Sequence, residues 1–558
     1  MESGRPDTLP DDYYLRNFHA LVGYVFDTYQ DLFTPEECSW YESIRRCDDS
    51  AQRLYVRLLT RKGSVFRLSR LKYPEINALG DAASQLASHQ LSVTSAPESL
   101  STLIQAYTKP ELLRMLSLDT LKSKSRVDLV DFILAANKED QQQFISKLQN
   151  ADGWISINGH AFWNLYNLCF FGNLYQDSSE FVLRDLGAVA YEDYEIPAGF
   201  RAFKSRSHVD AHMRYFECVA LWDLVDRKSK NALHNLSTQL PDVIPGDLTL
   251  LRRCDRLRNS IARQLERLGD LDGALSLFSL SVHPPARERC IRILLAKNEL
   301  DAADALLEKI FAAPMGESEL QVAIRLKKQL SKSRGDVIKN EPKYRPETST
   351  LTLMASEPRV EQVARKFYSQ FGTCSYTENC LVNGVLGLFI WDIVFHPING
   401  AFFNPFQHAP ADFYDPDFTI RRSDLLKDRF REMDKPLKFP ARVMENYVKH
   451  EGKSNPLVRW VGLPYELLSI ALQRIPFAHW RVMFERILTN PRENMAGFPD
   501  LVLFKTDDSY YEFIEIKGPG DTIQQNQLRW MQYFTKHRIP CRVVNVKWSV
   551  EQSNHEPL

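Results

Sequence analysis

The sequence lacks the features of secreted, membrane-spanning and zinc-finger proteins. Its nine cysteines are odd in number and form no Cys-x-x-Cys pair, which argues against a disulfide framework and a zinc finger and favours a reducing compartment. The N-terminus has no charged-then-apolar signal pattern. The most apolar run, Leu381–Phe395, is too short to cross a bilayer and contains Asn383 and Asp392, so we expect no membrane association and a buried helix here.

An excess of positive charge is also missing. The 70 Lys and Arg residues are balanced by 71 Asp and Glu residues, so the formal net charge is −1. Overall electrostatics therefore does not indicate a nucleic-acid partner, and any such contact must come from local basic patches. Apolar content is ample, because 44% of the 558 residues are hydrophobic. That length is enough for about three or four domains of roughly 100–200 residues each.

The pattern along the chain predicts a multidomain protein, mainly α in its N-terminal and middle regions, with an α/β domain at the C-terminus. Apolar spacing predicts helices over 13–29 and 51–71. A polar, charged and Pro-containing stretch predicts a linker. The predicted segments are 1–95 (helical), 96–135 (helical hairpin), 136–335 (helical repeats), 336–350 (linker) and 351–558 (C-terminal domain).

The hairpin at 96–135 has a clear helix start followed by a basic turn. Thr108 is expected to cap a helix in which Pro110 is early and Glu111 lies three residues on. The turn before the second helix carries Lys122, Lys124 and Arg126. Two short helices around a basic turn suit contact with phosphates. The pattern alone does not separate this from any other helical hairpin.

The middle region contains a weak internal repeat and two runs of arginine. The segment 269–275 resembles 298–304, which indicates stacked helical pairs. The arginines that recur near helical spacing are Arg252, Arg256, Arg263 and Arg267, with Arg287, Arg289 and Arg292 further on. Such a stripe is either a solvated helix face or a cationic track for a nucleic acid.

The residues with the strongest chemical signal lie near the C-terminus. A strand is predicted over 501–504, a turn at 507–509, a second strand over 510–517 and a helix capped by Asp521 or Thr522. If Asp507 and Asp508 are the central turn residues, counting outward places Asp500 directly across from Glu515. Two opposed carboxylates destabilise a sheet unless something compensates them, and a divalent cation would do so.

Lys517 lies two residues after Glu515 and therefore on the same strand face. A lysine there would orient an attacking water or offset charge on a phosphate in the transition state. The pattern predicts metal-dependent phosphodiester hydrolysis, with Mg²⁺ or Mn²⁺ as the cofactor. Glu-x-Lys alone is a weak signal. Within a strand–turn–strand–helix–strand pattern it is stronger, and the alternative is a solvated hairpin edge of mixed charge.

These motifs resemble a known family. The segments 497–502 (GFPDLV) and 514–519 (IEIKGP) resemble PD-(D/E)xK nucleases with a virus-type replication-repair nuclease (VRR-NUC) domain. The segments 13–18, 54–58 and 387–392 resemble the Fanconi-associated nuclease family, in the same order along nearly the whole chain. The resemblance implies that 96–135 is a SAP-like DNA-binding hairpin and that 136–335 is a TPR-like helical-repeat domain.

The resemblance also implies an activity and a fuller site. It implies 5′-flap endonuclease and 5′-to-3′ exonuclease action on branched DNA in interstrand crosslink repair. A fourth acidic ligand is implied on a helix before 387–392, and Glu378 matches by position. The expected metal ligands are then Glu378, Asp500, Glu515 and the backbone carbonyl of Ile516, for two ions, with Gln527 in support. The expected DNA-binding residues are Lys122, Lys124, Arg126, Arg252, Arg256, Arg263 and Arg289.

One feature of the family is missing from this sequence. Its eukaryotic members carry an N-terminal ubiquitin-binding zinc finger, and this chain has no Cys/His cluster that would form one. The expectation is therefore a bacterial form acting in the cytoplasm or nucleoid, whereas a eukaryotic form would act in the nucleus. Two alternatives remain open: a catalytically silent DNA-binding repair scaffold, and a junction resolvase, which would usually be a symmetric dimer.

Overall fold

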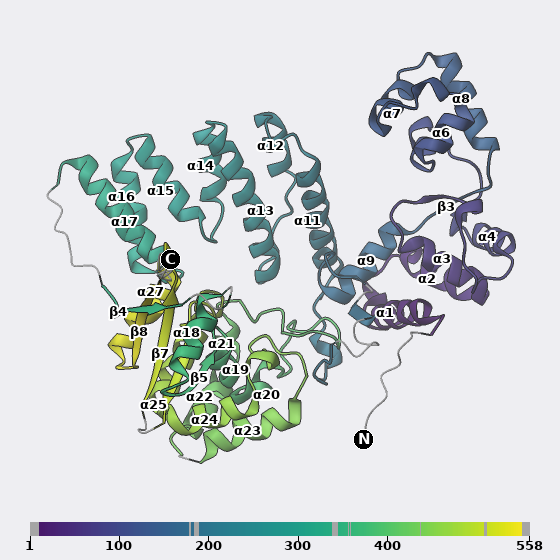
Figure 1. Ribbon diagram of the computed structural model, residues 1–558. Coiled ribbons are helices and arrows are strands. Elements are labelled where there is room, and N and C mark those ends of the chain that lie inside the picture. Colours follow the sequence, from purple (N-terminus) through teal and green to yellow (C-terminus); the bar gives the residue numbers. More distant parts are fainter. Residues whose placement is uncertain are drawn as a thin grey trace, which may run out of the picture. The chain divides into compact units, whose positions relative to one another are not determined.

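The computed structural model describes residues 10–177, 180–182, 189–336, 344–354, 357, 359–435, 437–506 and 510–549 (Figure 1). The chain divides into two compact units. The first unit comprises residues 1–188 and 201–213, and the second comprises 189–200 and 214–558. Among the described helices, none combines the length and the apolarity that crossing a membrane requires.

The first unit is mainly helical with one small sheet. Its sheet has the order β1-β3-β2, and both neighbouring pairs are antiparallel. The elements outside the hairpin are α1 (Tyr13–Tyr29), α2 (Pro35–Arg46), α3 (Asp49–Leu59), β1 (Val65–Arg67), α4 (Leu79–Ser88), β2 (Ser92–Val93), β3 (Trp154–Ile157) and α9 (His160–Phe171).

The helix predicted over 51–71 is wrong in its second half. The helix α3 ends at Leu59, and the chain then turns through Gly63, whose φ is +93°. The following residues form β1, which pairs with β3 over Val65–Arg67. The apolar spacing of this stretch fits both a helix and a strand. Pairing with β3, almost 90 residues further along the chain, favours the strand.

The predicted hairpin forms, and a further helix completes its core. Its helices are α5 (Leu100–Gln105), α6 (Lys109–Leu116) and α7 (Arg126–Leu134), followed by α8 (Lys138–Asn150). The predicted helix start is confirmed, because Thr108 and Glu111 form a capping box at the start of α6. Leu148 of α8 and Trp154 of β3 are buried in the same cluster, so the packed unit extends beyond residue 135.

The second unit begins its helical part with stacked pairs of helices. These are α12 (Lys230–Ser237), α13 (Leu248–Arg267), α14 (Leu271–Ser279), α15 (Ala286–Ala296), α16 (Leu300–Ala312) and α17 (Glu317–Arg334), while α11 (Arg206–Leu224) spans the boundary between the units. The internal repeat is confirmed at the turns α13–α14 and α15–α16. Gly269 and Asn298 occupy equivalent places there, both with positive φ. The backbone N–H of the following residue donates a hydrogen bond of 2.9 Å in both turns: Asp270 donates to the carbonyl of Leu265, and Glu299 donates to the carbonyl of Leu294.

A five-stranded mixed sheet forms the centre of the C-terminal region. Its order is β4-β8-β7-β6-β5, with β8 parallel to both β4 and β7 and with β6 antiparallel to both β7 and β5. The strands are β4 (Thr348–Leu353), β5 (Gly372–Tyr376), β6 (Leu501–Lys505), β7 (Tyr511–Lys517) and β8 (Cys541–Trp548). The sheet thus begins at Thr348, inside the segment that the sequence predicted as a linker; residues 337–343 of that segment lie outside the described residues.

Helices cover both faces of this sheet. The helices that contact its strands most are α18 (Val360–Tyr368) and α27 (Gln525–Lys536), and the remaining helices of the region are α19 (Leu381–Phe389), α20 (Trp391–Val394), α21 (Phe418–Arg421), α22 (Ser423–Glu432), α23 (Lys438–His450), α24 (Tyr465–Arg474), α25 (Phe477–Thr489) and α26 (Pro491–Asn494). In β6, Leu501 and Leu503 pack in the cluster with α18, whereas Val502 and Phe504 pack in the larger cluster on the other face. The alternation of strand side chains therefore sends Asp500 toward the larger cluster.

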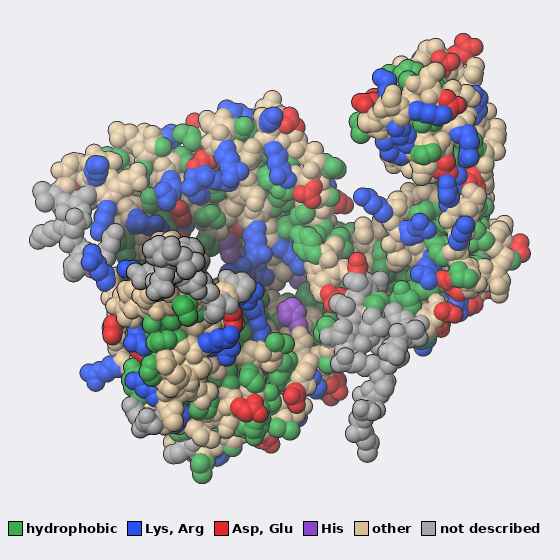
Figure 2. All heavy atoms as spheres, in the orientation of Figure 1, with side chains coloured by type: hydrophobic (Ala, Val, Ile, Leu, Met, Phe, Trp, Pro, Cys, Tyr) green, Lys and Arg blue, Asp and Glu red, His purple; other side chains and the backbone are tan. Residues whose placement is uncertain are grey.

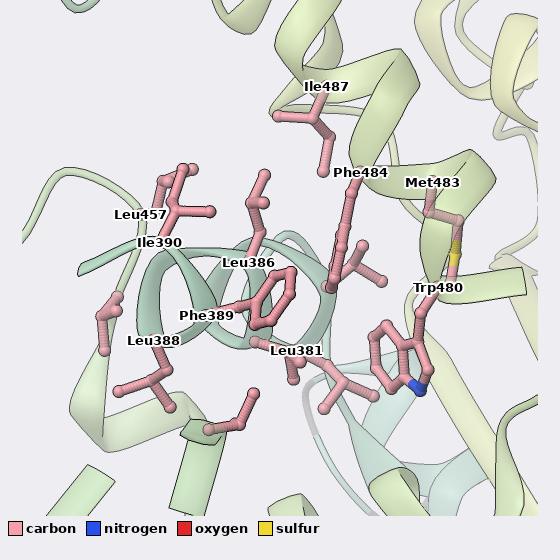
Figure 3. Packing of buried hydrophobic residues seen from close by; sticks show 14 of the residues in the cluster. Leu381, Leu386, Leu388, Phe389, Ile390, Leu457, Trp480, Met483, Phe484 and Ile487 are labelled. Carbon is pink, nitrogen blue, oxygen red and sulfur yellow. The ribbon is translucent and has the colours of Figure 1, made fainter. Parts of the chain in front are cut away.

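The apolar run 381–395 forms the buried helices that the sequence predicted. Every residue of α19 is buried. Figure 3 shows Leu381, Leu386 and Phe389 of α19 facing Trp480, Met483 and Phe484 of α25. This packing fixes the segment that leads into α19, and Glu378 lies in that segment.

Candidate active site

Asp500 and Glu515 face each other across the antiparallel pair β6–β7. Leu501 pairs with Ile514, and Asp500 immediately precedes this pair. The Asp500 carboxylate also accepts a hydrogen bond of 2.9 Å from the backbone N–H of Ile516. Residues 507–509 lie outside the described residues. The register on both sides of them is nevertheless the one that the two-residue turn predicts, so the predicted opposition of Asp500 and Glu515 is confirmed.

Glu378 reaches the other side of Asp500 from β5. The backbone N–H of Thr377 donates to the carbonyl of Asp500 at 2.8 Å, which continues the β5–β6 pairing by one residue. Glu378 follows in the turn before α19. The expectation that Glu378 lies on a helix is therefore wrong, because the ladder keeps the chain extended through Thr377 and α19 begins only at Leu381.

Lys517 and Gln527 hold the Glu515 carboxylate from one side. Glu515 Oε1 lies 2.7 Å from Lys517 Nζ and accepts a hydrogen bond of 2.7 Å from Gln527 Nε2. Lys517 Nζ donates to Gln527 Oε1 at 3.1 Å, which closes the network. Gln527 stands in the first turn of α27. This helix begins at Gln525 with Gln524 as its cap, so the predicted cap at Asp521 or Thr522 is wrong.

The residues around Asp500 and Glu515 do not fully neutralise the negative charge of these two buried carboxylates. Burial raises the pKa of Asp500 above its usual range; the hydrogen bond from Ile516 opposes this shift, and the charges of Glu378 and Glu361 add to it. Burial also raises the pKa of Glu515, and the charge of Asp500 adds to that shift. Lys517 lowers both pKa values without cancelling either shift. A site in this state favours a cation or a proton.

The donor set fits a divalent metal ion. Glu515 Oε2 is buried and has no hydrogen-bond partner. Carboxylate oxygens are ligands that Mg²⁺ and Mn²⁺ prefer, so this orphaned oxygen is well suited to one. The Glu378 carboxylate instead accepts from the hydroxyl of Tyr376 and from the side-chain amide of Asn379. Within the described ranges, no three Asp, Glu, His or Cys side chains are already gathered as an ion site.

Three residues of this region carried no signal in the sequence. Asn379 Oδ1 accepts hydrogen bonds from the backbone N–H groups of Gly497 and Phe498, at 2.9 and 3.2 Å, so it ties the Glu378 turn to the loop before Asp500. Tyr376 binds Glu378, and Glu361 of α18 acts on Asp500 through its charge. Asn379 is about 120 residues from its partners, and no local pattern predicts such a contact.

The basic turn of the hairpin is built in part from backbone contacts. Lys109 Nζ donates to the carbonyls of Lys122 and Lys124. The guanidinium of Arg126 donates to the carbonyl of Tyr107 at 2.7 Å. Lys122 forms an exposed ion pair with Asp119 at 3.1 Å. Lys122, Lys124 and Arg126 are all exposed, and Arg126 also links the start of α7 to the segment between α5 and α6.

Most of the predicted arginines in the helical repeats have acidic partners. Arg263 pairs with Glu266 at 2.7 Å, and Arg289 of α15 binds the same carboxylate with two nitrogens. Arg252 is mostly buried and pairs with Asp415. Arg256 is exposed and lines a groove of about 760 Å³ with Arg227, Arg263, Arg267, Arg289 and Trp222. Figure 2 shows Lys and Arg side chains gathered over this helical part.

Comparisons with known proteins agree with this architecture. Two family models match, "FAN1, HTH domain" at residues 12–92 and "VRR-NUC domain" at residues 435–548. A Fanconi-associated nuclease 1 homolog from Pseudomonas aeruginosa is 33% identical over 545 residues, which cover 97% of this chain and 96% of the relative. A homolog from Schizosaccharomyces pombe is 22% identical and covers 96% and 91% of the two chains.

Two solved structures match along almost the whole chain. The crystal structure of paFAN1 bound to DNA with a 2-nucleotide 5′ flap and a gap has a TM-score of 0.89 and 32% identity, and covers 98% of this chain and 100% of that one. The complex with a 1-nucleotide 5′ flap has a TM-score of 0.84 and 32% identity, with coverage of 97% and 100%. The VRR-NUC match contains Asp500, Glu515 and Lys517 but begins after Glu378.

Proposed function

This chain belongs to the Fanconi-associated nuclease family, and on that premise we propose that it is a divalent-metal-dependent nuclease that cuts branched DNA near a 5′ flap. The observation that carries the proposal is the buried pair Asp500 and Glu515, one oxygen of which has no hydrogen-bond partner. The 5′-flap DNA bound in the two similar paFAN1 structures supports the choice of substrate. We further propose that the activity serves the repair of DNA interstrand crosslinks, in the nucleoid of a bacterial cell.

Asp500 and Glu515 would hold a Mg²⁺ or Mn²⁺ ion, with Glu378 and the carbonyl of Ile516 completing the site for a second. The bound cation would lower the pKa of a coordinated water and polarise the scissile phosphate. The hydrogen bond from Ile516 N–H fixes the Asp500 carboxylate without neutralising it. Glu378, which now accepts a hydrogen bond from Asn379, would exchange this contact for the ion.

Lys517 would act on the phosphate or on the attacking water. Its ammonium is held by Glu515 and Gln527, and its side chain is only 12% exposed, so its position is set before substrate arrives. A preorganised cation next to the reaction centre stabilises charge that develops in the transition state. Gln527 fixes both Glu515 and Lys517, and it is a positioning residue rather than a catalytic one.

DNA would be held by basic side chains of the hairpin and of the helical repeats. Lys122 and Lys124 of the hairpin, and Arg256 of the helical repeats, are exposed and suited to phosphate contact. Arg252, Arg263 and Arg289 would contribute less directly, because Asp415 and Glu266 already engage them. Arg126 would keep the hairpin turn in shape.

The experiment is cleavage of a 5′-flap duplex by purified protein with Mg²⁺ or Mn²⁺. Asp500→Ala should reduce cutting by roughly 1,000-fold or more while sparing DNA binding. Asp424→Ala, which removes an exposed carboxylate on α22, is the matched control and should cut normally. If Asp500→Ala cuts as well as Asp424→Ala, the assignment of the site is wrong. If the wild-type chain binds flap DNA without cutting it under any metal, the chain is a scaffold.

A further inference from the structure

A short turn beside the acidic site presents a fully exposed aliphatic side chain. Val461 lies in the single-turn helix η5 (Trp460–Gly462), and its relative exposure is 103%. The turn itself is firmly anchored, since Leu457 and Leu463 on either side are at most 2% exposed. The indole of Trp460 also donates to the carbonyl of Lys453 at 2.7 Å. Singly exposed aliphatic residues are common on protein surfaces, but this one stands on a turn that is anchored on both sides.

Close packing fixes this turn against the segment that carries Glu378. A Cβ atom added to Gly462 would lie 2.6 Å from Cys380 Sγ, which is shorter than any real contact. Cys380 comes two residues after Glu378. Because Gly462 has no side chain, the turn that bears Val461 can approach the turn that carries Glu378.

Between this turn and α18 lies a groove of about 290 Å³. Its walls are formed by Gln362 and Arg365 from α18, Ser375 and Tyr376 from β5, and Val461 and Pro464 from the turn. Tyr376 connects the groove to the acidic site, because its hydroxyl donates to the Glu378 carboxylate while part of its ring remains exposed. The groove is therefore continuous with the site at which a phosphodiester would be cut.

The charge of the groove is opposite to that of the acidic site. None of its lining residues is acidic, and Arg365 contributes a guanidinium. Arg365 Nε donates a hydrogen bond of 3.2 Å to the neutral side chain of Gln362, and among the described residues no carboxylate forms an ion pair with Arg365. An unneutralised guanidinium beside an exposed aromatic ring and an aliphatic side chain is a combination that suits a nucleotide, whose phosphate is anionic and whose base stacks on apolar surfaces.

We propose that this groove holds a nucleotide of the cleaved strand next to the scissile phosphate, with Arg365 on its phosphate and its base against Tyr376 and Val461. The proposal rests on the proposed function, since it assumes that the substrate is DNA. The groove would fix how far the strand advances past the acidic site. Val461 would act as an apolar wedge against the stacked bases, as aliphatic side chains do in other proteins that unstack DNA.

The test uses the full-length Asp500→Ala protein, which we expect to bind without cutting, and flap DNA with a single 2-aminopurine placed at successive positions around the cut site. One position should change fluorescence on binding, because its base leaves the stack and contacts Tyr376. Tyr376→Leu should abolish this signal and weaken binding of single-stranded DNA by roughly tenfold. Tyr376→Phe should preserve both, because it keeps the ring and loses only the bond to Glu378. Arg365→Ala should lower the slope of log affinity against log salt by about one.

Cut-site mapping with the active enzyme gives a second measurement. Val461→Ser and Tyr376→Leu should spread or shift the cut position, while Val448→Ser and Arg431→Ala, exposed residues outside the groove, should leave it unchanged. If the groove variants cut at the same position and give the same fluorescence as their parents, the groove proposal is wrong while the nuclease stands. If the 2-aminopurine signal depends on Tyr376 but wild-type protein never cuts, the groove stands and the proposed nuclease activity falls.

Discussion

In the C-terminal sheet, Asp500 and Glu515 face each other with Lys517 beside Glu515, whereas in the helical repeats the carboxylate of Glu266 lies between Arg263 and Arg289. Both regions hold partly or fully buried charge. In the helical repeats, opposite charges satisfy each other and join α13 to α15. In the sheet, like charges stay together and one oxygen remains unpartnered. Charged groups that only stabilise a fold are neutralised by opposite charges of the protein, whereas charged groups that bind a ligand are left without full neutralisation.

The sharpest way to separate the two regions is to neutralise one carboxylate in each. Glu515→Gln should reduce flap cleavage by roughly 1,000-fold, because it removes an acidic ligand of the proposed metal ion and the partner of Lys517. Glu266→Gln should leave the rate of the chemical step unchanged, since Glu266 only joins helices. Single-turnover cleavage rates at saturating protein would measure this. Equal losses of cleavage rate in the two variants would show that the two carboxylates do not differ in role.

Gln527 tests whether the sheet site depends on its supporting hydrogen bonds. Gln527→Leu keeps the size of the side chain but removes its bonds to Glu515 and Lys517. We expect cleavage to fall by roughly 10- to 100-fold and the Mn²⁺ concentration for half-maximal activity to rise. Gln532→Leu, a change on the same helix, is the control. A Gln527→Leu variant with normal metal dependence would show that Glu515 and Lys517 hold their positions unaided.

The pH dependence of stability tests the uncompensated charge. The pKa values of Asp500 and Glu515 are raised in the fold, so between their ordinary and raised values the folded state binds more protons than the unfolded state. The free energy of unfolding of the metal-free protein should therefore decrease as pH rises through that window. Glu515→Gln should flatten this decrease and stabilise the metal-free protein at neutral pH by on the order of 1–2 kcal/mol.

Urea unfolding at several pH values in a chelating buffer would measure that effect. Added Mn²⁺ should stabilise the wild-type protein at neutral pH and have little effect on Glu515→Gln, because binding to the folded state alone raises its stability. A wild-type protein whose stability rises across the same pH window would contradict the electrostatic argument.

The smallest effect is expected from releasing arginines in the helical repeats. Glu266→Gln would leave Arg263 and Arg289 without their carboxylate at the edge of the Arg256 groove. If this groove contacts DNA, binding should strengthen a few-fold and the salt slope should increase by about one. Fluorescence anisotropy at several salt concentrations would measure both. Unchanged affinity and slope would show that these arginines have only the structural role.

The sequence predicted the sheet site better than the basic surfaces. The opposition of Asp500 and Glu515 followed from a two-residue turn and the alternation of strand side chains, both of which are local rules. The arginines also followed a local rule, helical spacing, and they lie on the expected helices. Their spacing could not reveal that Glu266 and Asp415 engage them, since those contacts depend on how neighbouring elements pack.

Tertiary structure also decided the surroundings of Glu378. The sequence matched this residue by position, but the ladder between β5 and β6 places it in a turn, and Asn379 ties that turn to the loop before Asp500. The groove beside Tyr376 depends on the approach of Gly462 to Cys380, residues more than 80 positions apart.

By itself, then, the sequence determined which side chains share one face of two paired strands, because alternation and turn length fix that over a few residues. Only the tertiary structure decided which charges are left unbalanced, because an ion pair, a hydrogen bond or a groove wall is completed by a residue from another element.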